Sequence, residues 1–191
     1  MSEFPLLAVT DSSSCPRPLP EQLERLADCD ARPSAVILRA KELNKADYRT
    51  LAEQAAQICA QQALPLILHS DWQLALELGI KRLHLPLALL RQLPQSARTQ
   101  FTWLSTSVHS VAEALEAQDL GATVLVAGHI YATQCKAGLA PRGLEFLKAV
   151  CAAVHLPVYA IGGIGFDAVQ HAELQKNGAR GACVMSAYMK L

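Results

Sequence analysis

The stretch that decides the fold is Ser110–Gly128, which reads SVAEALEAQDLGATVLVAG. Ser110 is a favourable N-cap for a helix, and Gly121 stands where that helix would end. The run Thr123–Ala127 that follows is apolar and rich in β-branched residues, which predicts a short buried strand. A helix followed at once by a buried strand is the repeating unit of a parallel α/β sheet.

The same alternation extends outward from this unit along the chain. The predicted strands are Leu6–Thr10, Ala35–Leu38, Leu66–His69, Arg82–Leu85, Thr102–Ser105, Thr123–Ala127, Val158–Ile161 and Gly181–Met185. The predicted helices are Pro20–Asp28, Lys45–Gln62, Trp72–Leu78, Leu87–Gln92, Val111–Leu120, Arg142–Val154 and Phe166–Lys176. Eight strands in this order predict an α/β fold of the (β/α)8 TIM barrel type.

The end of the chain predicts a truncated final helix. Only Ser186–Leu191 follow the last predicted strand, where a TIM barrel normally has a full helix. We therefore expect a neighbouring subunit or an N-terminal segment to cover the gap, which favours a homodimer. With 191 residues the chain is long enough for one core and short for two, so we expect a single TIM-barrel domain over residues 1–191.

Charge and cysteine content argue against several classes of protein. The 17 basic and 17 acidic side chains balance, so no net field attracts nucleic acid or an anionic membrane. The six cysteines form no C-x-x-C pair, which favours free thiols in a reducing compartment. No signal peptide and no apolar run of the ~20 residues needed to span a bilayer is visible. We expect a cytoplasmic protein with no nucleic-acid or membrane partner.

Polar residues gather where the predicted strands end, and in a TIM barrel these positions face one mouth. The candidates are Asp11, Arg39, Lys41, His69, Asp71, His84, Ser107, His109, His129, Cys135, Lys136, Gly162, Gly163 and Ser186. Neither H-x-H nor H-E-x-x-H spacing occurs, and acids at strand ends are confined to Asp11 and Asp71. We therefore expect no metal and no cofactor.

His129 is the strongest candidate for moving a proton. It follows Gly128, which leaves space for a ligand, and an imidazole titrates near neutral pH. For His69 and His84, a structural hydrogen bond to a loop is an equal alternative. For His109 a structural role is also open, because Ser110 beside it is a predicted helix cap.

Two further groups of residues are candidates for binding an anion. Arg39 and Lys41 alternate after a strand and would project on the same side to bind a carboxylate or a phosphate, although a solvated surface pair is the alternative. The turn at Gly162 and Gly163 would expose backbone N–H groups to a phosphate, and Met185–Ser186 would add a second cradle. A plain tight turn is the alternative for the two glycines.

These motifs resemble the thiamine phosphate synthase superfamily and, within it, the TenI-like thiazole tautomerases. Leu7–Asp11 resembles the family's opening strand, Ile37–Lys41 its Q-L-R-E-K segment and Ser107–His109 its S-x-H. Synthases of the family carry Asn-Asp after strand three and an acid after strand four, which hold the Mg²⁺ of a diphosphate substrate. This chain has His69-Ser70 and Leu85–Ala88 there. The synthase pattern G-P-I-F-x-T-x-T-K corresponds to Gly128–Lys136 in this chain. Here His129 stands in place of the proline and Cys135 in place of the last threonine, as in TenI.

The resemblance implies an isomerase of thiamine biosynthesis, a thiazole tautomerase-like enzyme that moves a proton on a carboxythiazole phosphate without a metal. His129 would be the acid and base. Substrate contacts would come from Arg39, Lys41, His69, Ser107, His109, Cys135 and Lys136, and phosphate contacts from Gly162, Gly163, Met185 and Ser186. Two alternatives remain: a thiamine phosphate synthase, which is a transferase, and a barrel that binds thiazole or thiamine phosphates without turnover. Activity that depends on magnesium would indicate the synthase, and ligand binding without turnover would indicate the non-catalytic barrel.

Overall fold

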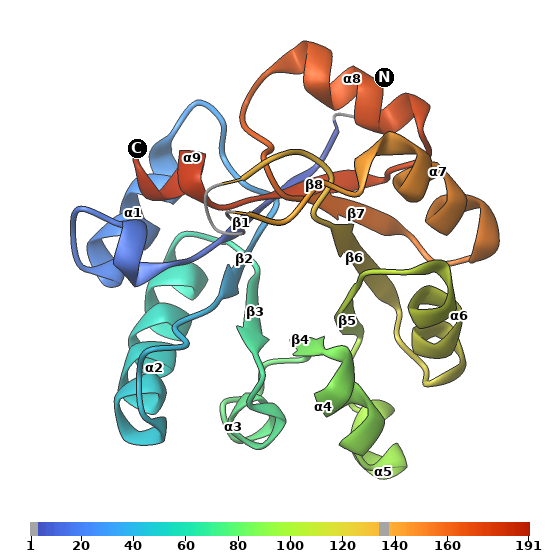
Figure 1. Cartoon of the computed structure of the whole chain (residues 1–191). Coiled ribbons are helices and arrows are strands. Elements are labelled where there is room, and N and C mark those ends of the chain that lie inside the picture. Colours follow the sequence, from blue (N-terminus) through green and yellow to red (C-terminus); the bar gives the residue numbers. More distant parts are fainter. Residues whose placement is uncertain (1–3, 134–137) are drawn as a thin grey trace.

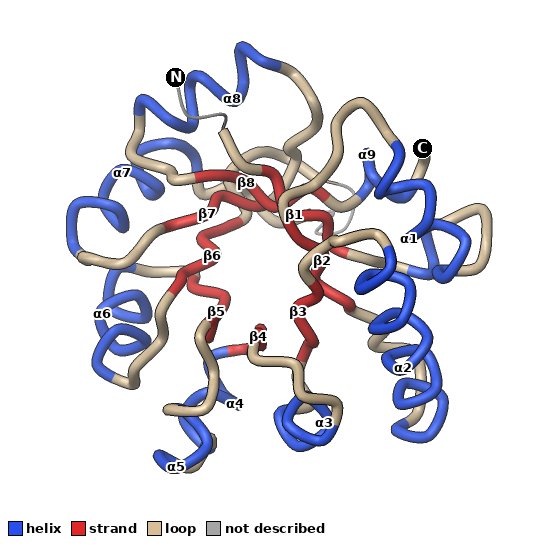
Figure 2. Tube along the Cα trace, turned by 180° about the vertical axis from the view of Figure 1, so that it is seen from behind, coloured by secondary structure: helices blue, strands red, loops and turns tan. Residues whose placement is uncertain are grey.

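Eight parallel strands form a closed barrel in which each strand pairs with the next along the chain and β1 pairs with β8. The computed structural model describes residues 4–133 and 138–191. The strands are β1 Leu6–Val9, β2 Ala35–Leu38, β3 Leu66–His69, β4 Arg82–Pro86, β5 Trp103–Val108, β6 Val124–Gly128, β7 Val158–Ile161 and β8 Gly181–Val184. The helices surround this ring on its outer side (Figures 1 and 2). The prediction of a TIM barrel is confirmed.

Helical segments follow the strands around the barrel. They are η1 Ser12–Ser14, α1 Leu19–Asp28, α2 Lys45–Gln61, α3 Trp72–Glu77, α4 Leu87–Gln92, α5 Gln95–Arg98, α6 Val111–Asp119, α7 Gly143–Ala153, α8 Ala168–Lys176 and α9 Ser186–Met189. The last of these, α9, is a single turn. The one-turn helix α5 was not predicted, because Pro94 at its N-cap was taken as the end of the preceding helix.

Alternating side chains divide the apolar residues between two layers. One face of the strands packs against the helices, and the other fills the barrel with side chains such as Leu7, Ile37, Ile67 and Val126. The strands lie within one or two residues of their predicted bounds except β5, which was predicted to end at Ser105 and runs to Val108. Its polar residues continue the strand because they find hydrogen-bond partners in the neighbouring strand β4, as described below.

Side chains at the N-cap positions stabilise the first turns of several helices. The predicted cap Ser110 accepts a hydrogen bond from the backbone N–H of Glu113 at 3.1 Å. Asn44, Asp71 and Asp167 cap α2, α3 and α8 in the same way. Each cap satisfies a backbone N–H that the first helical turn leaves without a partner.

The truncated C-terminal turn is anchored by one aromatic residue. Tyr188 of α9 is fully buried, and its hydroxyl donates to the carbonyl of Ala31 at 2.7 Å. Gln22 of α1 donates to the carbonyl of Tyr188 at 2.6 Å. A cavity of about 830 Å³ remains between α8, the N-terminal segment and the turn before β2. Within the described ranges, none of the helices has the length and apolar character that crossing a membrane requires.

Candidate active site at the barrel mouth

The end of β2 presents a guanidinium that is fixed by an acid from β1. Arg39 Nη1 lies 2.9 Å from Asp11 Oδ1. Burial raises the pKa of Asp11, but hydrogen bonds from Ser14, Ser13 and Arg39 and the charge of Arg39 outweigh it, so this pKa lies below its ordinary value. Asp11 is therefore a carboxylate that orients Arg39 at the rim.

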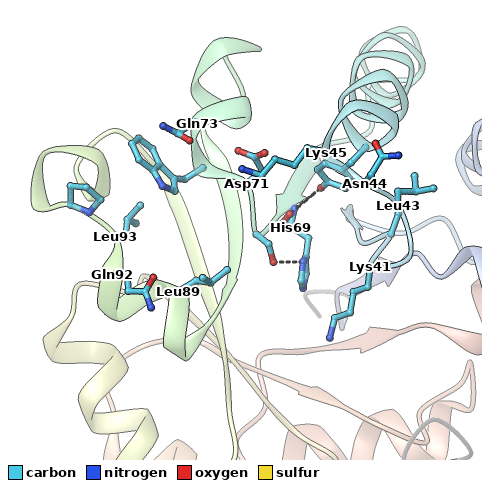
Figure 3. A pocket seen from close by; sticks show the side chains of 15 residues that line it. Lys41, Leu43, Asn44, Lys45, His69, Asp71, Gln73, Leu89, Gln92 and Leu93 are labelled. Carbon is cyan, nitrogen blue, oxygen red and sulfur yellow. Dashed lines mark hydrogen bonds between the residues drawn. The ribbon is translucent and has the colours of Figure 1, made fainter.

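A pocket of about 660 Å³ opens beside this ion pair, on the β2–β4 side of the mouth. Lys41 and His69 line one wall, while Leu89, Gln92 and Leu93 line the opposite one (Figure 3). Lys45 and Ser70 add a second cation and a hydroxyl to the lining. This arrangement suits a ligand that carries negative charge at one end and an apolar surface at the other.

His69 is held in place by its backbone and by its ring. Its N–H donates to the hydroxyl of Tyr48 at 3.1 Å, and that hydroxyl donates to the carbonyl of Leu38 at 2.9 Å. Its Nδ1 lies 2.6 Å from Ser70 Oγ. Burial, and then the charges of Arg39 and Lys41, lower the pKa of His69 to about 4. The imidazole is therefore neutral at neutral pH.

A second histidine lies deeper, inside the barrel. His84 of β4 is 5% exposed, and its ring centroid lies 5.4 Å from that of His69. Its Nδ1 and Nε2 are 2.9 Å and 3.0 Å from the hydroxyls of Ser105 and Ser107. Burial, and then His69 and Lys41, lower the pKa of His84 to about 3. Two uncharged imidazoles therefore lie beneath the mouth of the barrel. Ser107, which contacts His84, is the hydroxyl of this group that lies nearest the end of β5.

The remaining predicted histidines have structural partners. His109 Nδ1 lies 2.7 Å from the carbonyl oxygen of Gly128, so this nitrogen carries the proton and donates. His129 is 5% exposed; its Nε2 lies 3.4 Å from the carbonyl oxygen of Leu139, and its Nδ1 is buried without a partner among the described residues. His129 thus lies beneath the segment after β6, whereas the sequence suggested an open position for proton transfer.

The two glycines after β7 are required first by packing. Gly162 and Gly163 have φ angles of +103° and +69°. A Cβ on Gly162 would lie 2.3 Å from His129 Cβ, and one on Gly163 would lie 2.5 Å from the carbonyl oxygen of Ala132. The backbones of Gly163 and Ile164 donate no hydrogen bond to other backbone groups of the described chain. Close packing therefore explains why both positions are glycine. The N–H groups of Gly163 and Ile164 could still donate to a ligand.

The second predicted phosphate element lies beside this turn. Ile161 pairs with Cys183, which brings the Gly162–Gly163 turn alongside Met185 and the exposed Ser186. Two other predicted contacts, Cys135 and Lys136, lie outside the described residues. Of the predicted set, the structure brings together Arg39, Lys41 and His69 on one side of the mouth and the two phosphate turns on another.

The residues at the ends of β3 and β4 do not fit a magnesium site. They are His69 and Ser70 after β3, and Leu85 and Pro86 at the end of β4, whereas Mg²⁺ prefers carboxylate oxygens. Asp71 Oδ1 caps α3 by accepting from Leu74 N at 3.0 Å. Among residues 4–133 and 138–191, no group of three or more histidine, cysteine or acidic side chains is placed to hold a metal ion.

Comparisons with known proteins place the chain in a family. A profile of the family described as Thiamine monophosphate synthase matches residues 6–188. The chain belongs to this family. A thiamine-phosphate synthase of Desulfitobacterium hafniense strain Y51 is 34% identical over 158 residues, which cover 80% of this chain and 73% of the relative. One of Syntrophomonas wolfei is 30% identical over 195 residues, covering 98% and 90%.

A solved structure agrees with this membership in the thiamine monophosphate synthase family. The thiamine phosphate pyrophosphorylase of Pyrococcus furiosus has a TM-score of 0.78 and 25% identity, covering 97% of this chain and 87% of that one. The family points to an enzyme of thiamine biosynthesis.

The prediction of a thiazole tautomerase, and with it of an isomerase, is wrong. It rested on the departures after β3 and β4 and on His129 and Cys135, but the relatives that match most of the chain are named thiamine-phosphate synthase. His129 is 5% exposed, with its Nε2 3.4 Å from the carbonyl oxygen of Leu139, and Cys135 lies outside the described residues.

Sequence reasoning missed Ser105 and the pocket residue Lys45. Ser105 was taken as the last residue of a strand, although the alternation of Ser105, Thr106 and Ser107 already has the period of two that carries a strand onward. Lys45 is predicted only as the start of a helix. Its sequence neighbourhood does not indicate a pocket, because the opposite wall comes from α4, which is distant in sequence.

Proposed function

We propose that this chain is a transferase of the thiamine-phosphate synthase type, which joins a pyrimidine carried as a diphosphate ester to a phosphorylated thiazole. The observation that carries the proposal is a mouth that has groups able to donate to an anion on two sides. Lys41 and Lys45 line the pocket on the β2–β4 side. The N–H groups of Gly163 and Ile164 lie at the β7 turn. Both substrates of such a transferase are anions, one for each side.

The chemistry is a displacement at the carbon that bears the diphosphate. The lone pair of the thiazole ring nitrogen forms the new carbon–nitrogen bond, while the carbon–oxygen bond breaks and the diphosphate leaves with its electron pair. Negative charge grows on the leaving oxygen, and Arg39 and Lys41 are the side chains that would stabilise it. Holding both rings in one mouth lowers the entropic cost of the encounter. Because the residues after β3 and β4 do not fit Mg²⁺, no step is assigned to a metal.

The test is formation of thiamine phosphate from the two substrates, followed by chromatography, in one sample with Mg²⁺ and one with EDTA. We expect product in both samples. Product only with Mg²⁺ would support the transferase and overturn the assignment of charge stabilisation to side chains alone. No product in either sample would overturn the transferase.

A second candidate is a barrel that binds these phosphates without turnover. It is favoured by His69 and Ser70 at the end of β3, because an uncharged imidazole and a hydroxyl stabilise a leaving diphosphate less than a metal site would. Calorimetry with the thiazole phosphate, the pyrimidine diphosphate and thiamine phosphate tests it. Micromolar binding in a sample that forms no product supports this module, and steady turnover rules it out.

A further inference from the structure

The turn after β7 has two successive peptide groups whose carbonyl oxygens are both held. The carbonyl of Gly162 accepts from the N–H of Tyr131 at 3.0 Å. The carbonyl of Gly163 accepts from Nε2 of Gln170, a residue of α8, at 3.0 Å. Because a trans peptide points its C=O and its N–H in opposite directions, the N–H groups of Gly163 and Ile164 point away from these two partners. Neither N–H donates to a backbone group of the described chain.

Gln170 contacts this turn with both ends of its side-chain amide. Besides the bond from Nε2 to Gly163, its Oε1 accepts from the N–H of Gly165 at 3.1 Å. The two partners fix the orientation of the amide, because a carbonyl oxygen only accepts and a backbone N–H only donates. The side chain of Gln170 thus spans Ile164, which is 7% exposed and belongs to the core.

A turn of this composition needs such contacts if it is to keep one shape. Gly162 and Gly163 have φ angles of +103° and +69°, and glycine has more backbone freedom to lose than any other residue. An anion that binds to the N–H groups of a loose turn must also order that turn, which weakens binding. N–H groups that are already oriented receive the anion without this cost.

We propose that Gln170 is a positioning residue, which fixes the turn after β7 so that the N–H groups of Gly163 and Ile164 are oriented to donate to a phosphate. The proposal rests on the proposed function for the identity of that ligand, a phosphorylated thiazole. Gln170 acts through the backbone and not by touching the ligand. Its effect should therefore fall on the phosphate group, and not on the thiazole ring or on an anion bound beside Lys41.

Calorimetry with two probes measures this effect: the phosphorylated thiazole and the matching alcohol, which lacks the phosphate. Gln170→Met keeps the length of the side chain and removes both hydrogen bonds. The affinity for the phosphate ester should fall about tenfold, while the affinities for the alcohol and for inorganic pyrophosphate should stay within about twofold. Gln175→Met is the matched control, because Gln175 is an exposed glutamine of the same helix. It should change none of the three affinities.

NMR of the backbone amides reads the turn directly. In the wild-type chain the phosphate ester should shift the N–H signals of Gly163 and Ile164, and the alcohol should leave them in place. The N–H of Gly165 should exchange with solvent about tenfold faster in Gln170→Met, because its acceptor is gone. Circular dichroism checks that the variant is folded. The wild-type shifts decide the matter even for a variant that does not fold.

The proposal is wrong if the ester leaves both N–H signals unshifted, if Gln170→Met binds the ester as tightly as the wild type, or if it weakens ester and alcohol equally. Binding of neither probe to the wild type also overturns it. Failure of the transferase gives a different pattern. Product formation with unchanged ester affinity in Gln170→Met removes the role of Gln170 and leaves the transferase. A selective loss of ester affinity in a chain that forms no product keeps Gln170 and removes the transferase.

Discussion

His69 and His84 are uncharged because they are buried beside cationic groups at the mouth of the barrel. Burial is the main cause for both, with Arg39 and Lys41 adding to it for His69. The cost of charging them is part of the stability of the fold, because an unfolded chain exposes both rings to water.

The free energy of unfolding should therefore depend on pH through these two rings. Both pKa values lie below the ordinary value of 6.5, at about 4 and about 3. Above pH 6.5 the folded and unfolded chains hold the same number of protons on these groups. As the pH falls below this value, the unfolded chain binds protons that the folded chain does not, so stability is lost, at up to about 1.4 kcal/mol per histidine per pH unit.

Urea titrations between pH 7.5 and about 4.5 measure this dependence. His69→Asn should reduce it and leave the part that is due to His84, whereas His155→Asn, at an exposed position, should leave it unchanged. Equal pH dependence in wild type and His69→Asn would show that His69 is charged or accessible in the folded chain.

Lys41 should contribute to diphosphate binding. Removing its charge with Lys41→Met takes one cation from the pocket wall while keeping an apolar stem of similar length. Affinity for inorganic pyrophosphate, measured by calorimetry, should fall by about three- to tenfold. Lys148→Met, an exposed lysine of α7 on the outer layer, is the control. Equal losses in the two variants would place the anion elsewhere.

Single residues were predicted unevenly from sequence. Arg39, Lys41 and His69 were placed correctly at one mouth, because residues that follow parallel strands share that edge. How deeply each side chain is buried could not be predicted from the sequence pattern. His129 comes directly after β6 and His69 ends β3, yet His129 is 5% exposed, with its ring against the carbonyl oxygen of Leu139.

At the scale of elements, the segment after β6 is held against the turn after β7. The N–H of Ile130 donates to Ile161 O at 2.9 Å, and that of Tyr131 to Gly162 O at 3.0 Å. The hydroxyl of Tyr131 reaches Glu173 of α8 at 2.7 Å. These bonds extend strand-like pairing past the strands themselves and leave no space for a side chain at Gly162 or Gly163.

Gly163→Ala should therefore destabilise the chain, while Gly165→Ala in the same loop should be nearly neutral. The new Cβ at Gly163 would lie 2.5 Å from Ala132 O with φ at +69°, whereas one at Gly165 meets nothing within 4 Å. A loss of about 2 kcal/mol or more is expected for Gly163→Ala. Chemical denaturation measures both variants. Similar stability of the two would mean that the β6 segment moves away at little cost.

Element positions followed well from sequence because each strand is a short apolar run between helix signals. Ala35–Leu38, Leu66–His69 and Val158–Ile161 have the predicted bounds. The extension of β5 is missed, because Thr106 and Ser107 are polar; in the structure Thr106 donates to the carbonyl of Leu85 and Ser107 contacts His84, both in the neighbouring strand.

At the scale of the whole molecule, the pairing of β1 with β8 closes the barrel, and the C-terminal turn is bonded to α1. Tyr188 fills the space between α1 and β8, contacts the ring of Phe166 edge-on at 4.9 Å, and connects to Ala31 and Gln22 by hydrogen bonds. One aromatic residue thus connects the C-terminal turn to α1, to Ala31 and to Phe166. The homodimer stays a prediction, which light scattering on the purified chain tests.

Tyr188→Ala should cost about 3–5 kcal/mol of unfolding free energy, since it removes a fully buried aromatic ring. Tyr188→Phe should cost about 1–2 kcal/mol, because it leaves the carbonyl of Ala31 without its donor. Thermal and urea unfolding rank the two variants. A small effect of Tyr188→Ala would mean that another part of the molecule closes this side of the barrel.

The pairing of β1 with β8 also sets an order of events during synthesis. Leu6, Leu7 and Ala8 find their partners in Ala182, Cys183 and Val184, which lie within the last ten residues of the chain. Until β8 has been synthesised, β1 has one open edge that can pair with other extended segments. The barrel therefore stays open along this seam until the last of its eight strands has emerged from the ribosome.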